Sequence, residues 1–370
     1  MALYPNLINE ALKNVIYPGT KKNIIESEML ASDVRIDGQK VSLTLQFEKE
    51  NDPFMKSVVK AAEANIKYVC QQIGEPVEVE IKTQARQAPR PEPEKFLPGV
   101  KNVIAIASGK GGVGKSTVSA NLAVGLAMLG YKVGLLDADV FGPSVPKMFH
   151  LEDFQPYAEA VDGRDLLVPA EQYGVKLLSV GFFVDRDSAT IWRGSMASSA
   201  IKQFIGDTKW GELDYLLIDM PPGTSDIHLT VVQNLSLTGV VVVSTPQQVA
   251  LADARKGIDM FVNEKINVPV LGLVENMAWF TPAELPQNKY YLFGKEGVKR
   301  LAEEMQVPLL AQIPVVQSIC ESGDHGAPIV TNLDSMVGQS FLSLAQAVVT
   351  QTNLRNANLP RTQRVRTDSK

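Results

Sequence analysis

Glycines, lysines and hydroxyl groups are concentrated at residues 109–117, where the chain reads G-K-G-G-V-G-K-S-T. In a loop with this spacing, backbone N–H groups surround phosphates, Lys115 reaches the outer phosphates and the Ser116 hydroxyl binds Mg²⁺. A second lysine, Lys110, precedes the usual one. The pattern predicts that the chain binds a nucleoside triphosphate with Mg²⁺. The residues expected to bind the nucleotide are Gly109, Lys110, Gly111, Gly112, Val113, Gly114, Lys115, Ser116 and Thr117.

Two carboxylates, Asp137 and Asp139, follow an apolar run at residues 133–136. Residues i and i+2 of an extended chain point the same way, so both are expected to face the γ-phosphate. Phosphoryl transfer depends mostly on positioning and on neutralising charge. We therefore assign Asp137 to the attacking water and Asp139 to the metal. A solvated turn at a strand end is the alternative reading of this D-A-D sequence.

A third carboxylate, Asp219, ends the apolar run L-L-I-D and is followed by P-P-G-T-S-D. We expect Asp219 to contact Mg²⁺ through water, together with Ser116 and Asp139. Residues 219–226 would then order around the γ-phosphate and relax after hydrolysis. A plain strand-to-helix turn is the alternative, because D-x-P-P-G is a serviceable turn sequence.

An amide, Asn276, closes another apolar run in the sequence V-E-N. A side-chain amide both donates and accepts hydrogen bonds, so Asn276 is predicted to pair with the adenine edge. The sequence carries no second signal for the base.

These residues need elements to position them. Residues 103–107 are an apolar run before the glycine-rich loop, and helical spacing of apolar residues begins at Ser116 and ends at Gly130. Further strand candidates lie at 133–136, 175–180, 215–218, 240–243, 270–274 and 309–313. Strands that alternate with helices predict an α/β fold, a P-loop NTPase with a mostly parallel sheet covered by helices on both faces.

The chain divides at a proline-rich stretch. Residues 84–98 string four prolines through charged residues and predict an extended linker. Before it, residues 1–83 predict a small α+β domain, in which residues 41–47 alternate as a strand. After it, residues 99–350 form the nucleotide-binding domain. Residues 351–370 are polar and basic, and we expect them to be disordered.

Composition sets limits on partners and compartment. The net charge of −5 over 370 residues argues against nucleic acid as a partner. No apolar run reaches transmembrane length and the first residues carry no signal pattern, so we expect a cytoplasmic protein without a membrane partner. The two cysteines, Cys70 and Cys320, form neither a disulfide framework nor a C-x2-C metal motif.

Taken together, five segments resemble the Mrp/ApbC iron–sulfur cluster carrier ATPases. They read G-K-G-G-V-G-K-S-T, L-L-D-A-D-V-F-G-P-S, L-L-I-D-M-P-P-G-T-S-D, S-T-P-Q-Q-V-A-L-A-D and V-E-N-M. This family belongs to the deviant P-loop group, with septum-site and plasmid-partition ATPases and the nitrogenase iron protein. The likeness spans residues 100–349, and the first domain resembles a small iron–sulfur assembly module.

The resemblance implies a slow ATPase that acts as a homodimer. Lys110 would reach across to the partner's phosphates and so join Lys115 and Asp137 as a catalytic residue. The resemblance also implies an iron–sulfur cluster, with 4Fe–4S as one candidate, held between subunits by paired cysteines. The dimer would hand this cluster to apo-proteins or exchange it with assembly proteins.

The chain departs from the family pattern at its cysteines. Members usually carry C-x2-C after V-E-N-M, whereas residues 279–286 read W-F-T-P-A-E-L-P. Residues 51–54 of the first domain also lack the cysteine often found there. Thiolates are the standard cluster ligands, so Cys320 is the remaining candidate if a dimer axis brings two copies together. Cys70, on the apolar face of its helix, is predicted to be a packing residue.

Three functions fit these observations. The first is an ATP-hydrolysing iron–sulfur cluster carrier, as the resemblance implies. The second is a dimerising ATP switch of the MinD/ParA type that organises a partner without carrying a cluster, which the missing C-x2-C favours. The third, a metallochaperone for another metal, has no ligand cluster in its favour.

Overall fold

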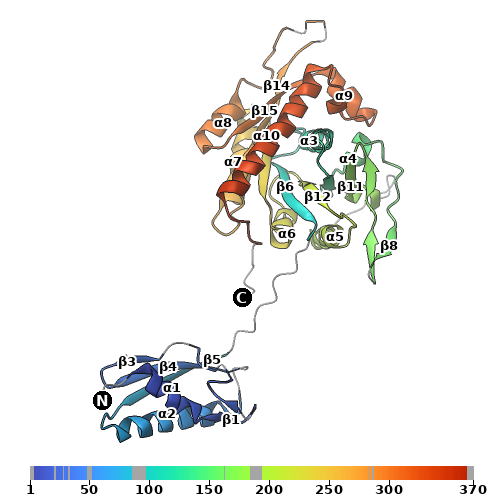
Figure 1. Cartoon of the computed structure of the whole chain (residues 1–370). Coiled ribbons are helices and arrows are strands. Elements are labelled where there is room, and N and C mark those ends of the chain that lie inside the picture. The colour runs from blue at the N-terminus through green and yellow to red at the C-terminus, as the bar shows by residue number, and fades with distance from the viewer. Residues whose placement is uncertain are drawn as a thin grey trace. The chain divides into compact units, whose positions relative to one another are not determined.

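The computed structural model describes residues 4–20, 22–27, 29–31, 34–47, 52–85, 97–161, 163–183, 194–282, 284–285 and 287–364. The chain forms two compact units, Met1–Glu94 and Lys95–Lys370 (Figure 1). Most of the predicted linker, residues 86–96, lies outside the described residues, as does the end of the predicted tail, residues 365–370. The domain limits of the sequence reading therefore stay a prediction.

The first unit packs two helices on a three-stranded sheet. Its strands follow the order β3-β4-β5, with β3 and β4 antiparallel and β4 and β5 parallel. Strand β4 buries every second residue because one face of the sheet meets the helices. Cys70 lies on the buried face of α2. The bounds are α1 Pro5–Lys13, β1 Ile16–Tyr17, β2 Lys22–Asn23, β3 Arg35–Asp37, β4 Lys40–Phe47, α2 Met55–Gln72 and β5 Glu78–Ala85.

The second unit contains an eight-stranded sheet with the order β10-β11-β7-β12-β6-β13-β14-β15. All neighbouring pairs are parallel except β10 with β11. The predicted α/β architecture with a mostly parallel sheet is confirmed. The strands are β6 Val100–Ser108, β7 Val133–Asp137, β10 Ala170–Gln172, β11 Val175–Ser179, β12 Leu213–Asp219, β13 Gly239–Ser244, β14 Val270–Phe280 and β15 Leu309–Val315.

Helices cover both faces of this sheet. One face packs against α5, α6, α7 and α8, and the other against α3 and α10 (Figure 1). An antiparallel pair, β8 Ala158–Val161 with β9 Arg164–Leu167, stands apart from the large sheet. The helices are α3 Lys115–Met128, α4 Val145–Met148, α5 Gly194–Gly206, α6 Asp226–Asn234, α7 Gln248–Val262, α8 Gly297–Met305, α9 Gln317–Asp324 and α10 Met336–Asn358, with short 3₁₀ turns at Val180–Phe183 and Ile329–Thr331.

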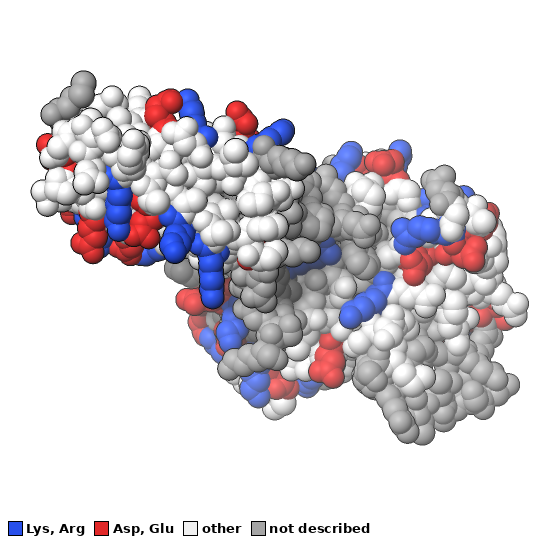
Figure 2. Space-filling model, turned by 90° about the horizontal axis from the view of Figure 1, so that it is seen from below, with Lys and Arg blue, Asp and Glu red and all other residues white. Residues whose placement is uncertain are grey.

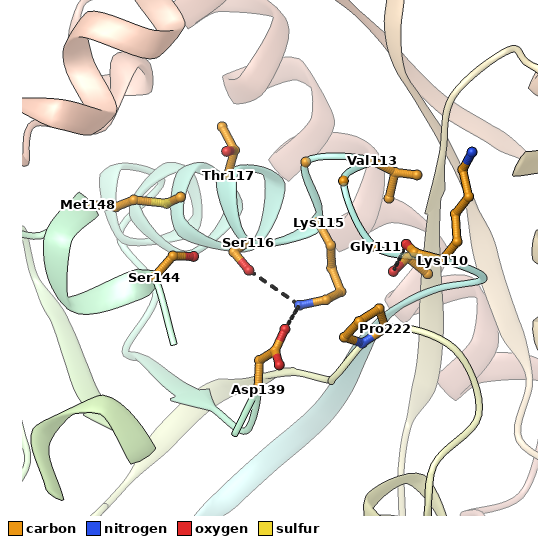
Figure 3. Close-up of a pocket in the computed structure, with 13 residues that line it drawn as sticks. Lys110, Gly111, Val113, Lys115, Ser116, Thr117, Asp139, Ser144, Met148 and Pro222 are labelled. Carbon is orange, nitrogen blue, oxygen red and sulfur yellow. Dashed lines mark hydrogen bonds and ion pairs between the residues drawn. The ribbon is translucent and has the colours of Figure 1, made fainter. Parts of the chain in front are cut away.

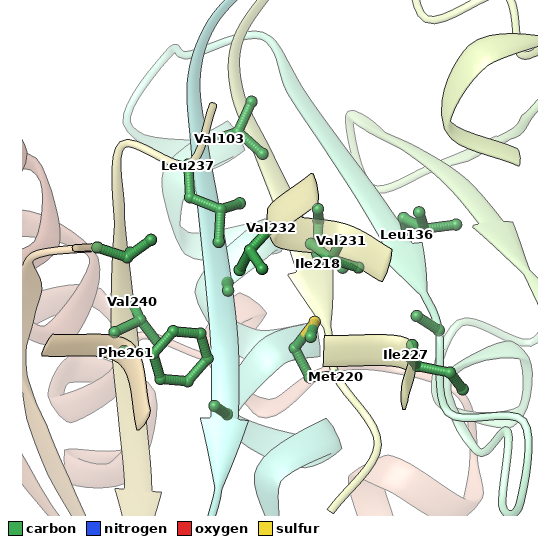
Figure 4. Close-up of a cluster of buried hydrophobic side chains, with 14 of the residues drawn as sticks. Val103, Leu136, Ile218, Met220, Ile227, Val231, Val232, Leu237, Val240 and Phe261 are labelled. Carbon is green, nitrogen blue, oxygen red and sulfur yellow. The ribbon is translucent and has the colours of Figure 1, made fainter. Parts of the chain in front are cut away.

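The core beneath the central strands fixes where their ends lie. Phe261 of α7 and Val231 of α6 pack on side chains from β12 and β13, including Ile218 and Val240 (Figure 4). Strand β12 is buried over nearly its whole length because helices cover both faces. The carboxyl ends of the parallel strands are therefore held rigidly at one edge.

The C-terminal region differs from its prediction. Helix α10 continues to Asn358, past residue 350, so the first part of the predicted tail is helical. Thr352 and Arg355 are buried and extend the core-facing side of the helix. The Arg355 guanidinium donates hydrogen bonds to the Pro360 carbonyl oxygen at 2.6 Å and to Thr362 Oγ1 at 2.8 Å. These contacts order a sequence whose polar composition alone predicts disorder.

The surface is mixed in charge. On the face shown in Figure 2, Lys and Arg side chains lie interspersed with Asp and Glu side chains. Within the described part of the chain, no helix has both the length and the apolar character that crossing a bilayer requires.

Candidate functional site

Three neighbouring strands end in polar residues at the same level of the sheet. Parallel pairing sets Ser179 of β11 beside Asp137 of β7, and Asp137 beside Asp219 of β12. The next strand, β6, runs directly into the glycine-rich loop. The carboxyl edge of a parallel sheet is where ligands bind in folds of this kind. The sheet register thus brings together residues that are distant in sequence.

A pocket of about 200 Å³ lies at this edge (Figure 3). Gly112 and Gly114 have φ of 78° and 79°, in the left-handed region that glycine adopts easily, and helix α3 begins directly afterwards at Lys115. Unpaired N–H groups at a helix N-terminus favour anions. The geometry suits a polyphosphate. The pocket is lined by Ser108, Lys110, Gly111, Gly112, Val113, Gly114, Lys115, Ser116, Thr117, Asp139, Ser144, Met148 and Pro222.

The Lys115 ammonium lies between two carboxylates. Its Nζ is 2.8 Å from Asp219 Oδ2 and 3.8 Å from Asp139 Oδ2, and Figure 3 shows Lys115 and Asp139 pointing toward each other. Ser116 donates to the same oxygen of Asp219 at 2.6 Å. Asp219 is fully buried, so its charge needs these partners. In this arrangement Lys115 is paired with carboxylates, whereas a bound nucleotide would attract it to the phosphates.

The predicted role of Asp137 needs correction. Asp137 is fully buried: Ser179 donates to its Oδ2 at 2.8 Å and the Asp139 N–H donates to its Oδ1 at 3.1 Å. Burial, and then the nearby charge of Asp219, raise the pKa of Asp137 to about 7. Among the described residues that line the pocket, Asp139 is the carboxylate present. The chain turns after β7, so that Asp139, and not Asp137, lines the pocket.

The oxygen atoms around Lys115 fit a magnesium ion. Mg²⁺ prefers oxygen ligands and usually binds through one or two carboxylates together with phosphate. Ser116 and Asp139 line the pocket, and Asp219, a second carboxylate, accepts a hydrogen bond from Ser116. Burial raises the pKa of Asp139, and the charge of Lys115 opposes that rise. The structure thus brings these three residues close together, and their binding of Mg²⁺ stays a prediction.

Lys110 and Asn276, two residues predicted to bind the nucleotide, make other contacts in the structure. The Lys110 ammonium points away from Lys115 and donates to Gln247 Oε1 at 3.5 Å (Figure 3). Asn276 donates from Nδ2 to the Val113 carbonyl oxygen at 2.8 Å and is buried. The amide predicted to read adenine therefore supports the glycine-rich loop from below. The loop backbone thus uses one N–H of this buried amide, and its pairing with adenine stays a prediction.

The segment after Asp219 is tied to the loop. The Gly223 N–H donates to the Ser108 carbonyl oxygen at 2.9 Å, and Pro222 lines the pocket. Ser225 and His228 form a reciprocal cap at the start of α6. Burial lowers the pKa of His228 to about 4, and its Nε2 has no hydrogen-bond partner among the described residues.

Two hydroxyls at the site were not found by sequence reasoning. Ser119 donates to Asp219 Oδ1 and Ser179 donates to Asp137 Oδ2. Ser119 follows Lys115 by four residues, a spacing that places both on one face of a helix, so a signal for it exists in the sequence. Ser179 carries no such signal, because its contact depends on the pairing of β11 with β7.

The two cysteines differ in their exposure to solvent. Cys320 is exposed on α9, and the charge of Asp324, to which its thiol donates, raises its pKa. Cys70 is buried in the first unit, and burial raises its pKa. Within the described ranges, no cluster of three or more His, Cys, Asp or Glu residues is placed to hold a metal ion.

Sequence comparison finds matches in both units. Residues 99–349 match the family described as NUBPL iron-transfer P-loop NTPase, and residues 7–80 match the family described as iron-sulfur cluster assembly protein. An iron-sulfur cluster carrier protein of Aquifex aeolicus is 51% identical over 257 residues, which is 69% of each chain. An iron-sulfur cluster carrier protein of Synechocystis sp. is 40% identical over 338 residues, covering 91% of this chain and 94% of the relative.

Structural comparison agrees with the sequence matches. A nucleotide-binding protein from Archaeoglobus fulgidus, solved in complex with ADP, is similar with a TM-score of 0.55 and 40% sequence identity. The similarity covers 64% of this chain and 92% of that protein.

Proposed function

The chain belongs to the NUBPL iron-transfer P-loop NTPase family, and from this membership we propose that it is an ATP-hydrolysing iron–sulfur cluster carrier that acts as a homodimer. The observation that carries the proposal is the position of Lys115, held between Asp219 and Asp139 at a pocket shaped for polyphosphate. The name of the relatives, iron-sulfur cluster carrier protein, supplies the cargo.

Nucleotide binding exchanges the partners of Lys115. The phosphates of ATP offer more negative charge than a single carboxylate, so Lys115 moves from Asp219 to the phosphates. Ser116, Asp219 and Asp139 would hold Mg²⁺, which would supply positive charge beside the phosphates. Asp139, freed from Lys115, orients the attacking water at the pocket wall. The protein's part in hydrolysis is thus positioning and charge neutralisation.

Hydrolysis changes the position of the segment after Asp219. Pro222 lines the pocket and Gly223 is bonded to the strand that precedes the loop. A change at the γ-phosphate position therefore moves this segment and the start of α6. We assign the coupling between nucleotide state and cargo or client binding to this segment. In the homodimer, Lys110, whose ammonium points away from Lys115, reaches the phosphates of the partner.

The ligands of the cluster would come from cysteine side chains. Thiolates are the usual ligands, and Cys320 is the exposed cysteine of the chain. Two copies in a dimer would contribute one Cys320 thiolate each, with remaining positions filled by the client or by small thiols. The absence of cysteine from residues 279–286 favours the second candidate, an ATP switch that organises a partner without a cluster.

An anaerobic reconstitution separates these candidates. The full chain is incubated with iron and sulfide, and cluster absorbance and transfer to an apo-ferredoxin are followed with and without ATP and Mg²⁺. A carrier acquires absorbance and passes it to the acceptor. ATP hydrolysis without any cluster uptake would support the switch, and failure to bind nucleotide at all would overturn both.

A further inference from the structure

We propose that Ser119 is a positioning residue of the magnesium–nucleotide site, which it serves by fixing the carboxylate of Asp219. The inference rests on the proposed nucleotide function and deepens it. Ser119 lies outside the G-K-G-G-V-G-K-S-T motif, one helical turn beyond Lys115 on α3. Both Ser119 and Asp219 are fully buried.

The first part of α3 supplies three donors to one carboxylate. Lys115 and Ser116 both contact Asp219 Oδ2, at 2.8 and 2.6 Å, whereas Ser119 Oγ donates to Asp219 Oδ1 at 2.5 Å. The outer oxygen, Oδ2, thus contacts Lys115 and Ser116, which line the pocket, and the inner oxygen, Oδ1, contacts Ser119. Ser119 is the donor that occupies the inner oxygen, and it sets the rotation of the carboxylate.

The Ser119 hydroxyl has two acceptors in reach but one hydrogen to give. The Lys115 carbonyl oxygen is 3.1 Å away, and Asp219 Oδ1 is 2.5 Å away. A hydrogen bond to an ionised carboxylate is shorter and stronger than one to a neutral carbonyl. The hydrogen therefore goes to Asp219, and the contact is more than the local back-bonding that serine often makes in helices.

This contact matters more once nucleotide is bound. Lys115 leaves Asp219 for the phosphates, so Asp219 loses its ion pair while it stays buried. Ser119 then is the donor left on the inner oxygen, and it keeps the outer oxygen directed toward Ser116 and the metal. Without it, the carboxylate is free to rotate, and Mg²⁺ adds less to nucleotide affinity.

The test measures ADP binding by calorimetry on the full chain, once with Mg²⁺ and once with EDTA. For Ser119→Ala we expect the ratio of the two affinities to fall about tenfold, as for loss of a hydrogen bond to a charged group, with affinity in EDTA nearly unchanged. Ser119→Cys keeps the shape with a weak donor and should lower the ratio less, and it serves as the second variant if the alanine protein does not fold.

A matched control is available in α10. Thr352 is also buried and donates to the carbonyl oxygen four residues earlier, Val348, at 2.7 Å, but it makes no hydrogen bond to a carboxylate of the described residues. Thr352→Val should leave the ratio unchanged. In an Asp219→Asn background, Ser119→Ala should have little further effect on it. An unchanged ratio in Ser119→Ala, or an equal loss with Mg²⁺ and with EDTA, would overturn the inference. Absence of ADP binding by the wild type would instead overturn the proposed function.

Discussion

Gly109, the first glycine of the phosphate-binding loop, lies directly against the backbone of Asp253 in α7. A Cβ on Gly109 would overlap the carbonyl carbon of Asp253, far inside van der Waals contact. The close approach of helix α7 therefore requires glycine at this position.

This contact predicts opposite effects for two glycine substitutions. Gly109→Ala should lower the free energy of unfolding by roughly 1–3 kcal/mol, because backbone cannot yield as a side chain can. Gly257→Ala, inside α7 with open space around a Cβ, should raise it by about 0.5–1 kcal/mol. Thermal unfolding of both variants checks the pair. Equal stability of the two would contradict the packing argument.

The two loop lysines should separate binding from turnover. Lys115→Ala should weaken ATP affinity by at least roughly 10- to 100-fold, since it removes a charged hydrogen bond to phosphate. It should also destabilise the nucleotide-free protein by about 3–5 kcal/mol, because Asp219 keeps a buried charge without its partner. Lys110→Ala should spare both affinity and stability but reduce dimer-dependent hydrolysis. Calorimetry and phosphate release measure these effects, and an equal loss of ATP affinity in both variants would count against the cross-subunit role.

The corrected assignment of Asp139 gives a third prediction. Asp139→Asn should lower turnover by about 100-fold or more, as expected when a water-orienting carboxylate is lost. ATP affinity measured in EDTA, where no Mg²⁺ ligand is lost, should stay the same or increase, because a negative charge beside the phosphates is removed. Asp214→Asn, in the same strand as Asp219 but at its opposite end and exposed in part to solvent, is the control and should be active. Normal turnover of Asp139→Asn would return the role to Asp137.

Burial of His228 predicts a pH effect on stability. Its pKa is lowered to about 4 in the folded protein, chiefly by burial, from 6.5 in the unfolded chain. As pH falls below 6.5, His228 binds a proton in the unfolded state but stays neutral in the folded state. The folded protein therefore loses stability from about pH 6.5 down to pH 4. Between pH 7 and pH 5.5 the loss is about 1 kcal/mol, or about 2–4 °C in melting temperature.

The matched variant is His228→Gln, which keeps a capping side chain at the start of α6 but does not titrate. The difference in melting temperature between wild type and variant should change in favour of the variant as pH is lowered. A constant difference from pH 7 to pH 5.5 would show that His228 takes up its proton freely in the folded protein.

The Cys320 thiol provides a last prediction, on cluster loading. Asp324 raises its pKa, so the thiolate that binds iron is scarcer at neutral pH and loading should increase as pH rises. Asp324→Asn should increase loading at pH 7, whereas Asp334→Asn, another acidic residue outside α9, should not. Cys320→Ala should lose the cluster and Cys70→Ala should retain it. Full cluster absorbance in Cys320→Ala would remove Cys320 as a ligand.

Local patterns were enough to predict much of the second unit. The apolar runs at 103–107 and 215–218 became β6 and β12, because strands covered on both faces need continuous apolar residues. The glycine-rich loop could also be predicted, because its function depends on its own backbone. The prediction that residues 351–370 are disordered was wrong for the end of α10. Some buried positions of this helix, including Arg355, carry polar side chains, which composition alone does not mark as buried.

Contacts between distant segments decided the rest. Asp137 and Asp139 look equivalent in sequence, and only the turn after β7 and the pairing with β11 bury the first and expose the second to the pocket. Asn276 was predicted to pair with the adenine edge, and in the structure its side-chain amide donates a hydrogen bond to the backbone of the glycine-rich loop. No pattern within a single segment carries this information.

By itself, the sequence determined the ligand class, the parallel sheet and the loop that grips phosphate, because each depends on residues that are neighbours along the chain. The tertiary structure alone decided which carboxylate lines the pocket, and that Asp219 is held by the first turns of α3. Those outcomes depend on sheet register and on burial, which arise when strands far apart in the chain pack side by side.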